Sequence, residues 1–413
     1  MTSGDDILDG ADTLLTPKGL KVKSYETLQN LWAGYGHIAR LQVIPIDEDA
    51  PSNASYRGKT QSLILKIVKP PHQNGKSKKQ VDEGHLRKLI SYQVEQRFYT
   101  DFARQVPASI APVAECIASV SESSRAGEPT IAMVLTDLKE TFSVEGEKRG
   151  ELNETQVHAA LRWLAGFHGF WWRSAGSVSR EAMRLPPLEE ARLNRKNGRA
   201  GLWLNGGYTY LATRQKEYAS LKEDEDSEWC TALCTPVPES KTGQTMAELV
   251  AQILSPSIDN SSPSPTREYE TLIHGDVKSE NLFTNTSGSE VAFFDFQYVG
   301  LGLGVCDLAK LFTCSVTKSL LAGSMQIPSH LDMQDGECQL LEYYRNTLEE
   351  ISGKKYPWDE IVMHWKTALV DWHRFQISWG QWGNSEWLEA RVRQILRDQT
   401  WIEWAVEAAE QKP

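Results

Sequence analysis

The chain lacks the features that mark membrane-spanning, secreted and nucleic-acid-binding proteins. No stretch of about 18 apolar residues is present to form a transmembrane helix. The first residues are acidic and do not form a charged segment followed by an apolar one, as a secretory signal would. Basic residues are in deficit, because 44 Lys and Arg against 55 Asp and Glu leave a formal net charge of −11. This charge disfavours binding to nucleic acid or to an anionic membrane.

Paired cysteine spacing is also missing. The six cysteines are spread along the chain without a C-x-x-C pair, and Cys230 and Cys234 have no histidine or second cysteine pair nearby to complete a zinc site. We therefore expect free thiols in a reducing compartment and a cytoplasmic protein. The 413 residues are enough for two lobes with cores of their own.

The most informative segment runs from Ile273 to Asn281 with the sequence IHGDVKSEN, followed by an apolar run that ends at Asp295. Phosphoryl transfer from ATP needs a carboxylate to receive or orient the acceptor hydroxyl, and oxygen ligands for the metal that bridges the phosphates. Asp276 is the candidate base. Asn281 and Asp295 are candidate Mg²⁺ ligands, because a hard cation prefers oxygen donors.

These residues resemble the catalytic and metal-binding loops of the aminoglycoside phosphotransferase, choline kinase and ecdysteroid kinase-like families, which share the protein-kinase fold. Gly275 after His274 is typical of the small-molecule kinases, since protein kinases usually carry Arg in that place. The resemblance implies an α+β, protein-kinase-like fold of two lobes. We expect a small β-rich N-lobe over residues 1–137 and a large helical C-lobe over residues 138–413.

The same resemblance implies a strand lysine that contacts the α- and β-phosphates. Lys66 lies among apolar residues downstream of Gly34-Tyr35-Gly36, and Lys69 competes for the role. Strand alternation puts the two lysines on opposite faces, and we prefer Lys66 because its apolar neighbours are typical of an inward-pointing lysine. Its expected partner is Glu95, which precedes Phe98-Tyr99 as in the ecdysteroid kinase-like pattern.

Other nucleotide contacts are implied more weakly. Gly34 and Gly36 are expected in a loop that covers the phosphates, although Ala39 takes the place of the third glycine in G-x-G-x-x-G. Thr136 and Leu138, which follow an apolar strand, resemble the hinge whose backbone groups meet adenine. ATP and Mg²⁺ are the cofactors that these residues would bind.

Three residues of the catalytic region are expected to act around the candidate base. Lys278 either neutralises charge on the transferring phosphoryl group or pairs locally with Glu280, and the sequence leaves both roles open. It departs from the antibiotic kinases, which tend to have His there. His274 is expected to orient the loop backbone rather than to titrate. Asp307, in Cys306-Asp307-Leu308-Ala309, matches a family residue that supports the catalytic loop by hydrogen bonding.

The hydrophobic pattern predicts the elements around these motifs. Strands are expected at residues 36–45, 62–68 and 131–135. A helix is expected from residue 83 to 104, where apolar residues recur every three or four positions before Pro107. A second helix should begin after Asn153 or Thr155. We expect loops at residues 46–61, 70–80, 223–228 and 255–267.

Tryptophan recurs every seven residues near the C-terminus, at Trp358, Trp365, Trp372 and Trp379. This spacing places the rings on nearly the same face of a helix. They either pack the core of the helical lobe or line a pocket for an aromatic or cationic acceptor, because ring faces attract cations.

The sequence therefore predicts an ATP- and Mg²⁺-dependent kinase that phosphorylates a hydroxyl of a small molecule, either an amine-bearing or a steroid-like alcohol. No nucleic-acid or membrane partner is expected. The alternative is a catalytically silent pseudokinase that binds nucleotide or serves as a scaffold. A protein kinase is disfavoured, because no A-P-E segment follows Asp295 at a suitable distance and no room is left for a long activation loop.

Overall fold

The computed structural model describes most of the chain as two compact units. Unit 1 comprises residues 1–105 and 113–143, and unit 2 comprises residues 106–112 and 144–413. We expected the lobe boundary after residue 137. The division instead places residues 138–143 in unit 1 and residues 106–112 in unit 2. The described residues are 4–31, 34–46, 60–70, 82–123, 129–174, 178–193, 200–259, 266–324 and 326–412. The expected basic loop at Lys76–Lys79 and the predicted loop segments 47–59 and 260–265 lie outside them.

Unit 1 is built on an antiparallel sheet of five strands in the order β1-β2-β3-β5-β4. The predicted strands at residues 36–45, 62–68 and 131–135 are confirmed as β2, β3 and β5. The first and fourth strands were not predicted. The bounds are β1 (Leu20–Asn30), β2 (Gly36–Pro45), β3 (Gln61–Val68), β4 (Cys116–Ser123) and β5 (Pro129–Thr136).

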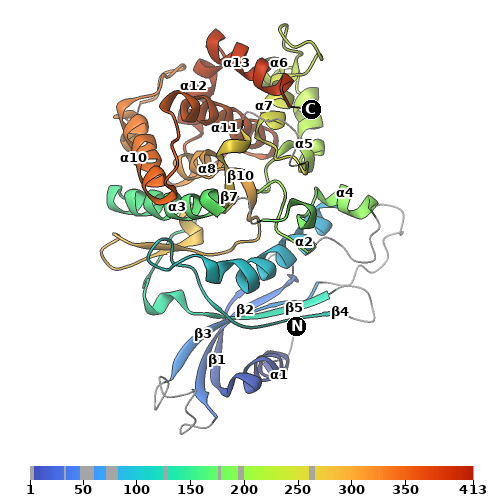
Figure 1. Ribbon diagram of the computed structural model, residues 1–413, viewed down its shortest axis with the longest axis vertical. Helices are drawn as coiled ribbons and strands as arrows, with labels where there is room; N and C mark the ends of the chain where they lie inside the picture. Colours follow the sequence, from blue (N-terminus) through green and yellow to red (C-terminus); the bar gives the residue numbers. More distant parts are fainter. Residues whose placement is uncertain are drawn as a thin grey trace. The chain divides into compact units, whose positions relative to one another are not determined.

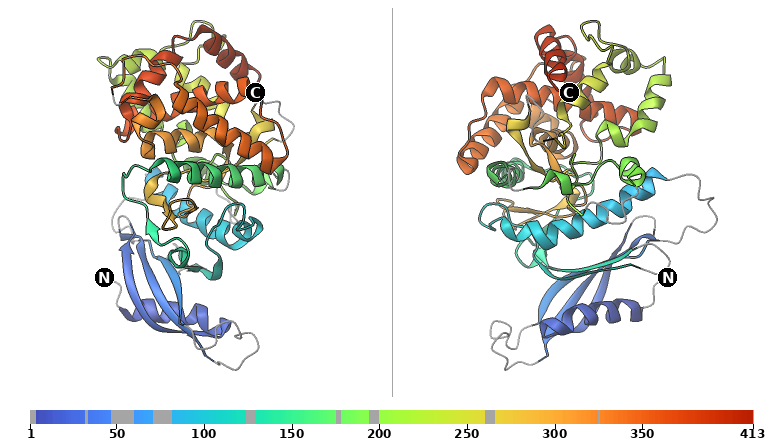
Figure 2. Two further views of the ribbon diagram at one scale, coloured as in Figure 1. Left: turned by 90° about the vertical axis from the view of Figure 1, so that its left-hand side faces the viewer. Right: turned by 45° about the vertical axis from the view of Figure 1, so that its right-hand side comes forward.

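Helices cover both faces of this sheet (Figure 2). On one face α1 (Gly4–Leu15) packs Ala11, Leu14 and Leu15 against the apolar side chains of the strands. Alternate residues of β2 are buried, as a strand with one face in a core requires. The other face carries α2 (Glu83–Arg97), whose N-terminus is capped by Asp82. The chain continues α2 as a π-helical turn and a short 3₁₀ turn to Gln105, so the predicted helix of residues 83–104 is present with changed geometry near its end.

Unit 2 is mainly helical (Figure 1). Its longest helix, α11, packs against α5, α7, α8 and α12, while α3 packs against α10. The predicted helix after Asn153 is α3. The bounds are α3 (Glu154–Ser174), α4 (Pro187–Arg192), α5 (Gln215–Glu223), α6 (Glu228–Cys234), α7 (Met246–Leu254), α8 (Val305–Ser315), α9 (Lys318–Ala322), α10 (Asp335–Ser352), α11 (Trp358–Trp379), α12 (Ser385–Ile395) and α13 (Gln399–Glu410).

The tryptophans of α11 differ in exposure. Trp365 and Trp372 are buried and pack the core of unit 2, whereas Trp379 is 59% exposed. Burying a side chain as large as Trp removes much apolar area from water and strongly stabilises a helical core. The packing interpretation therefore holds for the middle of the helix, and Trp379 at its end is left for another role.

Short strands in unit 2 hold the ends of the predicted catalytic segment. β7 (Glu270–Ile273) pairs antiparallel with β10 (Gly300–Leu303). β8 (Leu282–Thr284) lies between β6 (Val144–Glu145) and β9 (Val291–Phe293). The loop 274–281 therefore connects β7 to β8, and the loop 294–299 connects β9 to β10, so both loops are fixed at each end by sheet hydrogen bonds.

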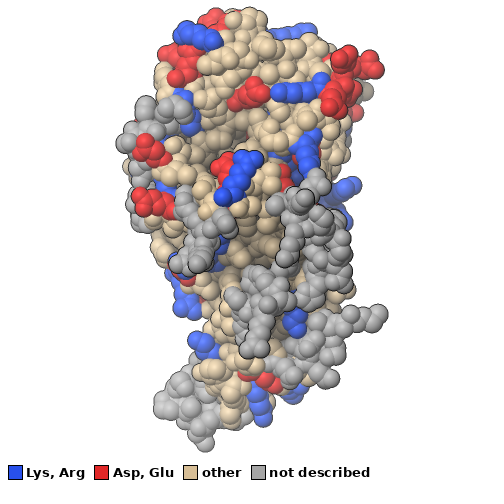
Figure 3. Space-filling model, turned by 90° about the vertical axis from the view of Figure 1, so that its right-hand side faces the viewer, with Lys and Arg blue, Asp and Glu red and all other residues tan. Residues whose placement is uncertain are grey.

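The architecture confirms the predicted α+β class, with a β-rich N-terminal part and a large helical C-terminal part. Among the described residues, none of the helices combines the length and the apolar character needed to cross a membrane. On the face shown in Figure 3, acidic and basic side chains lie intermixed.

Candidate active site

The loop that follows β7 begins with two residues whose backbone is tightly enclosed. His274 is fully buried, and Gly275 has a φ of +87°. A β-carbon at residue 275 would lie 2.4 Å from the carbonyl oxygen of Tyr298 and 2.7 Å from the amide nitrogen of Gly207. Only glycine fits this position, because both its backbone conformation and its surroundings exclude a side chain. The glycine that suggested small-molecule kinases therefore also has a local steric cause.

Asp307 of α8 holds this loop through its backbone. One carboxylate oxygen accepts the amide N–H of His274 at 2.7 Å, and the other accepts that of Gly275 at 2.9 Å. The ring of His168 in α3 lies 3.2 Å from the same carboxylate. Burial by itself would raise the pKa of Asp307, but the hydrogen bond and charge of His168 outweigh it and hold the pKa below its ordinary value. The carboxylate therefore remains ionised and keeps both backbone bonds, as expected from the sequence.

His274 uses both ring nitrogens within the loop. Nε2 lies 2.9 Å from the carbonyl oxygen of Phe294, and Nδ1 accepts the amide N–H of Asp276 at 3.3 Å. Burial lowers the pKa of His274 despite nearby carboxylates, so the ring is neutral, with its proton on Nε2. A neutral histidine with both nitrogens engaged joins the two loops and orients the backbone of Asp276.

The side chain of Asp276 is held on one side only. Its Oδ2 accepts from Nδ2 of Asn281 at 3.0 Å and lies 3.2 Å from Nζ of Lys278. In the part of the chain that the structure describes, no donor is bonded to Oδ1. Asp276 is buried with 8% exposure. A carboxylate fixed through one oxygen presents the other in a defined direction, which is what a general base requires.

Lys278 makes the local pair with Glu280 that the sequence offered as one alternative, and it also contacts Asp276, while its action on the transferring phosphoryl group stays a prediction. Its ammonium lies 3.2 Å from Asp276 Oδ2 and 3.0 Å from Glu280 Oε1. Burial would lower the pKa of Lys278, but the two carboxylates dominate and raise it above its ordinary value. The lysine is therefore permanently charged beside the candidate base.

Asn281 is oriented so that its oxygen can serve a cation. Both described contacts of its Nδ2 are to Asp276, one to the backbone carbonyl at 2.8 Å and one to Oδ2. This orientation leaves the amide oxygen without a donor among the described residues. Its backbone carbonyl accepts the amide N–H of Phe294 at 3.0 Å. The second candidate ligand, Asp295, therefore comes directly after Phe294, whose backbone is hydrogen-bonded to that of Asn281.

Asp295 has a φ of +65°, which is unusual for a residue other than glycine. Gln297 Nε2 donates to its Oδ1 at 2.7 Å. Strained backbone of this kind clusters at functional sites, where the surrounding structure fixes it. No role was predicted for Gln297, and the contact identifies it as a residue that orients a candidate metal ligand.

The two candidate oxygen ligands are compatible with Mg²⁺, whose binding stays a prediction. Among the described residues, no group of three or more His, Cys, Asp or Glu side chains is placed to hold a metal ion. Mg²⁺ is usually bound by one or two protein oxygens, with water and phosphate oxygens completing its shell. The amide oxygen of Asn281 and the carboxylate of Asp295 are the groups that would hold it.

In unit 1 the structure pairs Lys66 with Glu95. Lys66 lies in β3, opposite Ile38 of β2 and Met133 of β5, and its Nζ is 2.6 and 2.9 Å from the two Glu95 oxygens. Both side chains are buried, and Nζ also lies 5.4 Å from the ring centre of Tyr92. The preference for Lys66 with Glu95 as its partner is matched by this geometry, while contact with phosphate stays a prediction.

The two glycines of the predicted phosphate loop are favoured for different reasons, one steric and one conformational. A β-carbon at Gly36 would lie 1.9 Å from the carbonyl oxygen of Ile67, so β2 and β3 can approach only with glycine there. Gly34 has a φ of +75° and no atoms near a hypothetical β-carbon among the described residues. Between them, Tyr35 is buried and its ring contacts that of Tyr92, with centres 6.1 Å apart. The loop is thus tied to the helix that carries Glu95.

The predicted hinge is held by hydrogen bonds at its start. The amide N–H of Thr136 donates to the carbonyl of Glu115 at 3.0 Å, and the Thr136 hydroxyl accepts the Glu115 N–H at 2.9 Å. Asp137 accepts from Arg40, Ser62 and the Lys139 amide, and these bonds outweigh its burial and lower its pKa. The carbonyl of Leu138 accepts from Thr141 and Phe142. Adenine contact at Thr136 and Leu138 stays a prediction.

An aromatic cluster lies near the candidate base and was not predicted as a group. Tyr208 is close enough for the charge of Asp276 to help burial raise its pKa. Its ring contacts Tyr298 and Phe375 at 5.0 and 5.6 Å. The guanidinium of Arg214 lies against the cluster, 5.7 Å from Tyr208, 5.1 Å from Phe375 and 4.9 Å from Trp379. The glycine pair before Tyr208 was the only sequence signal for this loop, and it is not specific.

The ecdysteroid kinase-like family model matches residues 46–327 of the chain. Solved structures similar to the whole chain include macrolide 2'-phosphotransferase MphH from Brachybacterium faecium, with a TM-score of 0.43, 13% identity, and coverage of 95% of this chain and 98% of that one. Choline kinase from Cryptosporidium parvum gives a TM-score of 0.41 at 11% identity, covering 98% of each chain. An amicoumacin kinase in complex with AMP-PNP and Ca²⁺ gives 0.39 at 14% identity, covering 96% of this chain and 94% of that one. No curated protein matches.

Proposed function

The chain belongs to the ecdysteroid kinase-like family, and on this premise we propose that it is an ATP- and Mg²⁺-dependent kinase that transfers the γ-phosphate to a hydroxyl of a small molecule. The observation that carries the proposal is the state of Asp276. Its Oδ2 is anchored by Asn281 and Lys278, and its Oδ1 meets no donor among the described residues. Such a carboxylate can accept or orient the proton of an incoming hydroxyl.

The neighbouring residues divide the remaining tasks. Lys278, held in its charged form, would reduce the negative charge that gathers near Asp276 as phosphate is transferred. Asn281 and Asp295 would hold Mg²⁺, which when bound with ATP neutralises charge on the phosphate oxygens. Lys66, oriented by Glu95, would bind the α- and β-phosphates.

The acceptor is proposed to be a neutral, steroid-like alcohol in preference to an amine-bearing one. Arg214 already lies against the rings of Tyr208, Phe375 and Trp379. The guanidinium, which is paired with Glu217, already occupies the ring faces that would attract a cation, whereas a neutral apolar molecule would bury area against the remaining ring surface. We place the enzyme in the cytoplasm, since all six cysteines are free thiols.

The proposal is tested by an ATP-consumption screen over a library of metabolite alcohols, run with the wild-type protein and with Asp276→Asn. We expect Mg²⁺-dependent phosphorylation of at least one alcohol, lost in the variant. Product mass spectrometry should find one added phosphoryl group on the alcohol. ATP binding without any transfer that depends on Asp276 would instead identify a pseudokinase.

A further inference from the structure

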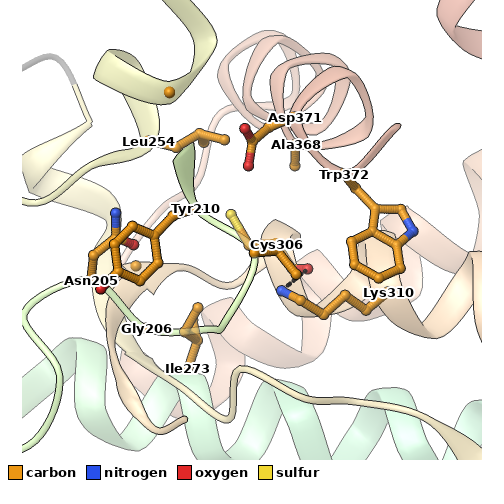
Figure 4. Close-up of a pocket in the computed structure, with 13 residues that line it drawn as sticks. Asn205, Gly206, Tyr210, Leu254, Ile273, Cys306, Lys310, Ala368, Asp371 and Trp372 are labelled. Atoms are coloured by element: carbon orange, nitrogen blue, oxygen red, sulfur yellow. Dashed lines mark hydrogen bonds between the residues drawn. The ribbon is translucent and has the colours of Figure 1, made fainter. Parts of the chain in front are cut away.

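A partly enclosed cavity with polar and apolar side chains in its lining lies inside unit 2, beside the catalytic loop (Figure 4). Its volume is about 30 Å³, and about 470 Å³ of empty space is present when the mouth is included. The smaller volume has room for about two water molecules or for one small polar group. Side chains from α7, α8 and α11 and from the loop 205–210 line it.

Two buried charged groups face this cavity from different helices (Figure 4). Lys310 of α8 is 4% exposed and Asp371 of α11 is 9% exposed. The Lys310 ammonium donates one bond, at 3.2 Å, to the carbonyl of Cys306, and lies 5.8 Å from the ring centre of Trp372. Across the described chain no carboxylate comes within 4.0 Å of it. Two of its three N–H groups therefore have no acceptor among the described residues.

Asp371 is also only partly satisfied. Its Oδ1 accepts from Nε of Arg374 at 2.9 Å, and Arg374 in turn donates to the backbone carbonyl of Thr209 at 2.6 Å. No donor from the described residues is bonded to Oδ2. Burying charge without a full set of partners costs stability, so a cavity with a donor and an acceptor both unused is a poor choice for packing alone.

The chemistry of the two groups selects the ligand. A carboxylate would accept from Lys310 but meet Asp371, and an ammonium would meet the opposite repulsion. A hydroxyl satisfies both, because it accepts one hydrogen bond and donates another. Cys306, whose pKa burial raises to about 12, stays a neutral thiol and adds no competing charge.

The cavity adjoins the candidate base through one residue, Gly207. Its amide N–H donates to the carbonyl of Tyr298 at 2.9 Å, and the same amide nitrogen packs against Gly275, the residue before Asp276. A β-carbon at Gly207 would lie 3.6 Å both from Nζ of Lys310 and from the carbonyl oxygen of Gly275. The Lys310 ammonium therefore lies close to the backbone of the loop that carries Asp276.

We infer that the cavity between Lys310 and Asp371 binds a hydroxyl group of the acceptor other than the one that is phosphorylated. The acceptor is then an alcohol with at least two hydroxyls, one at Asp276 and one held between the ammonium and the carboxylate. The inference rests on the proposed function for the identity of the ligand as acceptor, but the binding itself does not need ATP.

The test uses the full-length protein without nucleotide, with cyclohexanol and the isomeric cyclohexanediols as probes and melting temperature as the readout. We expect at least one diol to raise the melting temperature of the wild type more than cyclohexanol does. Lys310→Met and Asp371→Asn should lose this extra shift. Lys318→Met, which removes an ammonium paired with Glu386 outside the cavity, should keep it.

Lys310→Met should also melt at or above the wild-type temperature, because it replaces a poorly paired buried charge with an apolar side chain of similar length. If a charge variant fails to fold, Ala368→Leu supplies the same test, since it fills the cavity from α11 without altering either charge. Equal diol shifts in the wild type and these variants, or a larger shift with cyclohexanecarboxylate than with the diols, would overturn the inference.

A second readout separates this inference from the proposed function. Once an acceptor is known, Lys310→Met should raise its KM by about tenfold or more while leaving the KM for ATP unchanged. If phosphoryl transfer depends on Asp276 but not on Lys310, the kinase proposal holds and the proposed hydroxyl site in the cavity is wrong. Diol binding that depends on Lys310, in a protein without transfer, would do the reverse.

Discussion

The two sets of candidate site residues are held in place by different kinds of interaction. In unit 2, Asp276 belongs to a loop whose backbone is bonded to Asp307 and to the ring of His274, with sheet hydrogen bonds at each end. In unit 1, the described polar contacts of Lys66 centre on one carboxylate, that of Glu95. The catalytic loop is thus fixed by several bonds to its backbone, whereas Lys66 is held through its side chain, which forms an ion pair with Glu95.

This difference indicates where substitutions should affect folding and where they should affect ligand binding. Replacing a side chain that is hydrogen-bonded to the backbone of the loop should destabilise the whole loop. A buried ion pair can be removed as a unit, because two apolar side chains of similar size need no partners. The four experiments below test the contrast, from the largest expected effect to the smallest.

Asp276→Asn should have the largest effect, and the effect should fall on turnover alone. The amide keeps the shape of the side chain and its contact with Asn281 but cannot act as a base, so kcat should fall by about 10²- to 10⁴-fold. The melting temperature and the affinity for ATP should change little. Asp332→Asn, an exposed carboxylate bonded to Gln394, is the matched control and should keep full turnover.

Glu95→Gln should destabilise the protein by about 3 to 5 kcal/mol, because it removes the carboxylate charge that is paired with the buried Lys66 ammonium. The double variant Lys66→Met/Glu95→Gln should recover much of this stability, yet both forms should bind ATP weakly. Asp101→Asn, which breaks the exposed pair with Arg97, should cost about 1 kcal/mol or less. Denaturant unfolding and ATP titration measure the two effects. A double variant as unstable as Glu95→Gln would contradict the ion-pair interpretation.

Asp307→Asn should lower the free energy of unfolding by about 2 to 4 kcal/mol and reduce turnover, since one loop amide loses a charged acceptor. The pH dependence has a definite sign. The pKa of Asp307 is lowered by folding, so its contribution is complete above the unfolded carboxyl value near 3.8 and is lost as the pH falls through the lower folded pKa. The gap in stability between wild type and variant should therefore close only below about pH 4. If the difference in stability between wild type and variant closed near neutral pH, a group other than Asp307 would be its cause.

Gln297→Ala should give the smallest effect. Removing a residue that orients a metal ligand typically costs about 10- to 100-fold in metal affinity, and Asp295 keeps its backbone position here. We expect the Mg²⁺ concentration for half-maximal turnover to rise by about tenfold, with little change in melting temperature. Gln394→Ala, on the surface of α12, is the control. An unchanged Mg²⁺ midpoint would remove Gln297 from the metal site.

Several parts of the fold and site could be predicted because their signals are local in the sequence. The alternation of β2, the three-and-four spacing in α2 and the order of Asp276, Asn281 and Asp295 all depend on residues close together in the chain. Strand β1 and helix α1 were missed for the opposite reason. Five residues in the second half of β1 are exposed, which gives no clean apolar alternation, and α1 is recognisable mainly by what it packs against.

The sequence by itself predicted the class of chemistry, because phosphoryl transfer needs a base and oxygen ligands for a metal, and these residue types lie close together in the chain. It also predicted Lys66 in preference to Lys69, because strand alternation puts the two on opposite faces and the neighbours of Lys66 are apolar. Only the tertiary structure decided which atoms are left to act. Asp276 Oδ1, the Asn281 amide oxygen, and the unused donors and acceptor of Lys310 and Asp371 are defined by what other side chains have already taken. Hydrogen bonds between residues far apart in the chain make that selection, and no local pattern records them.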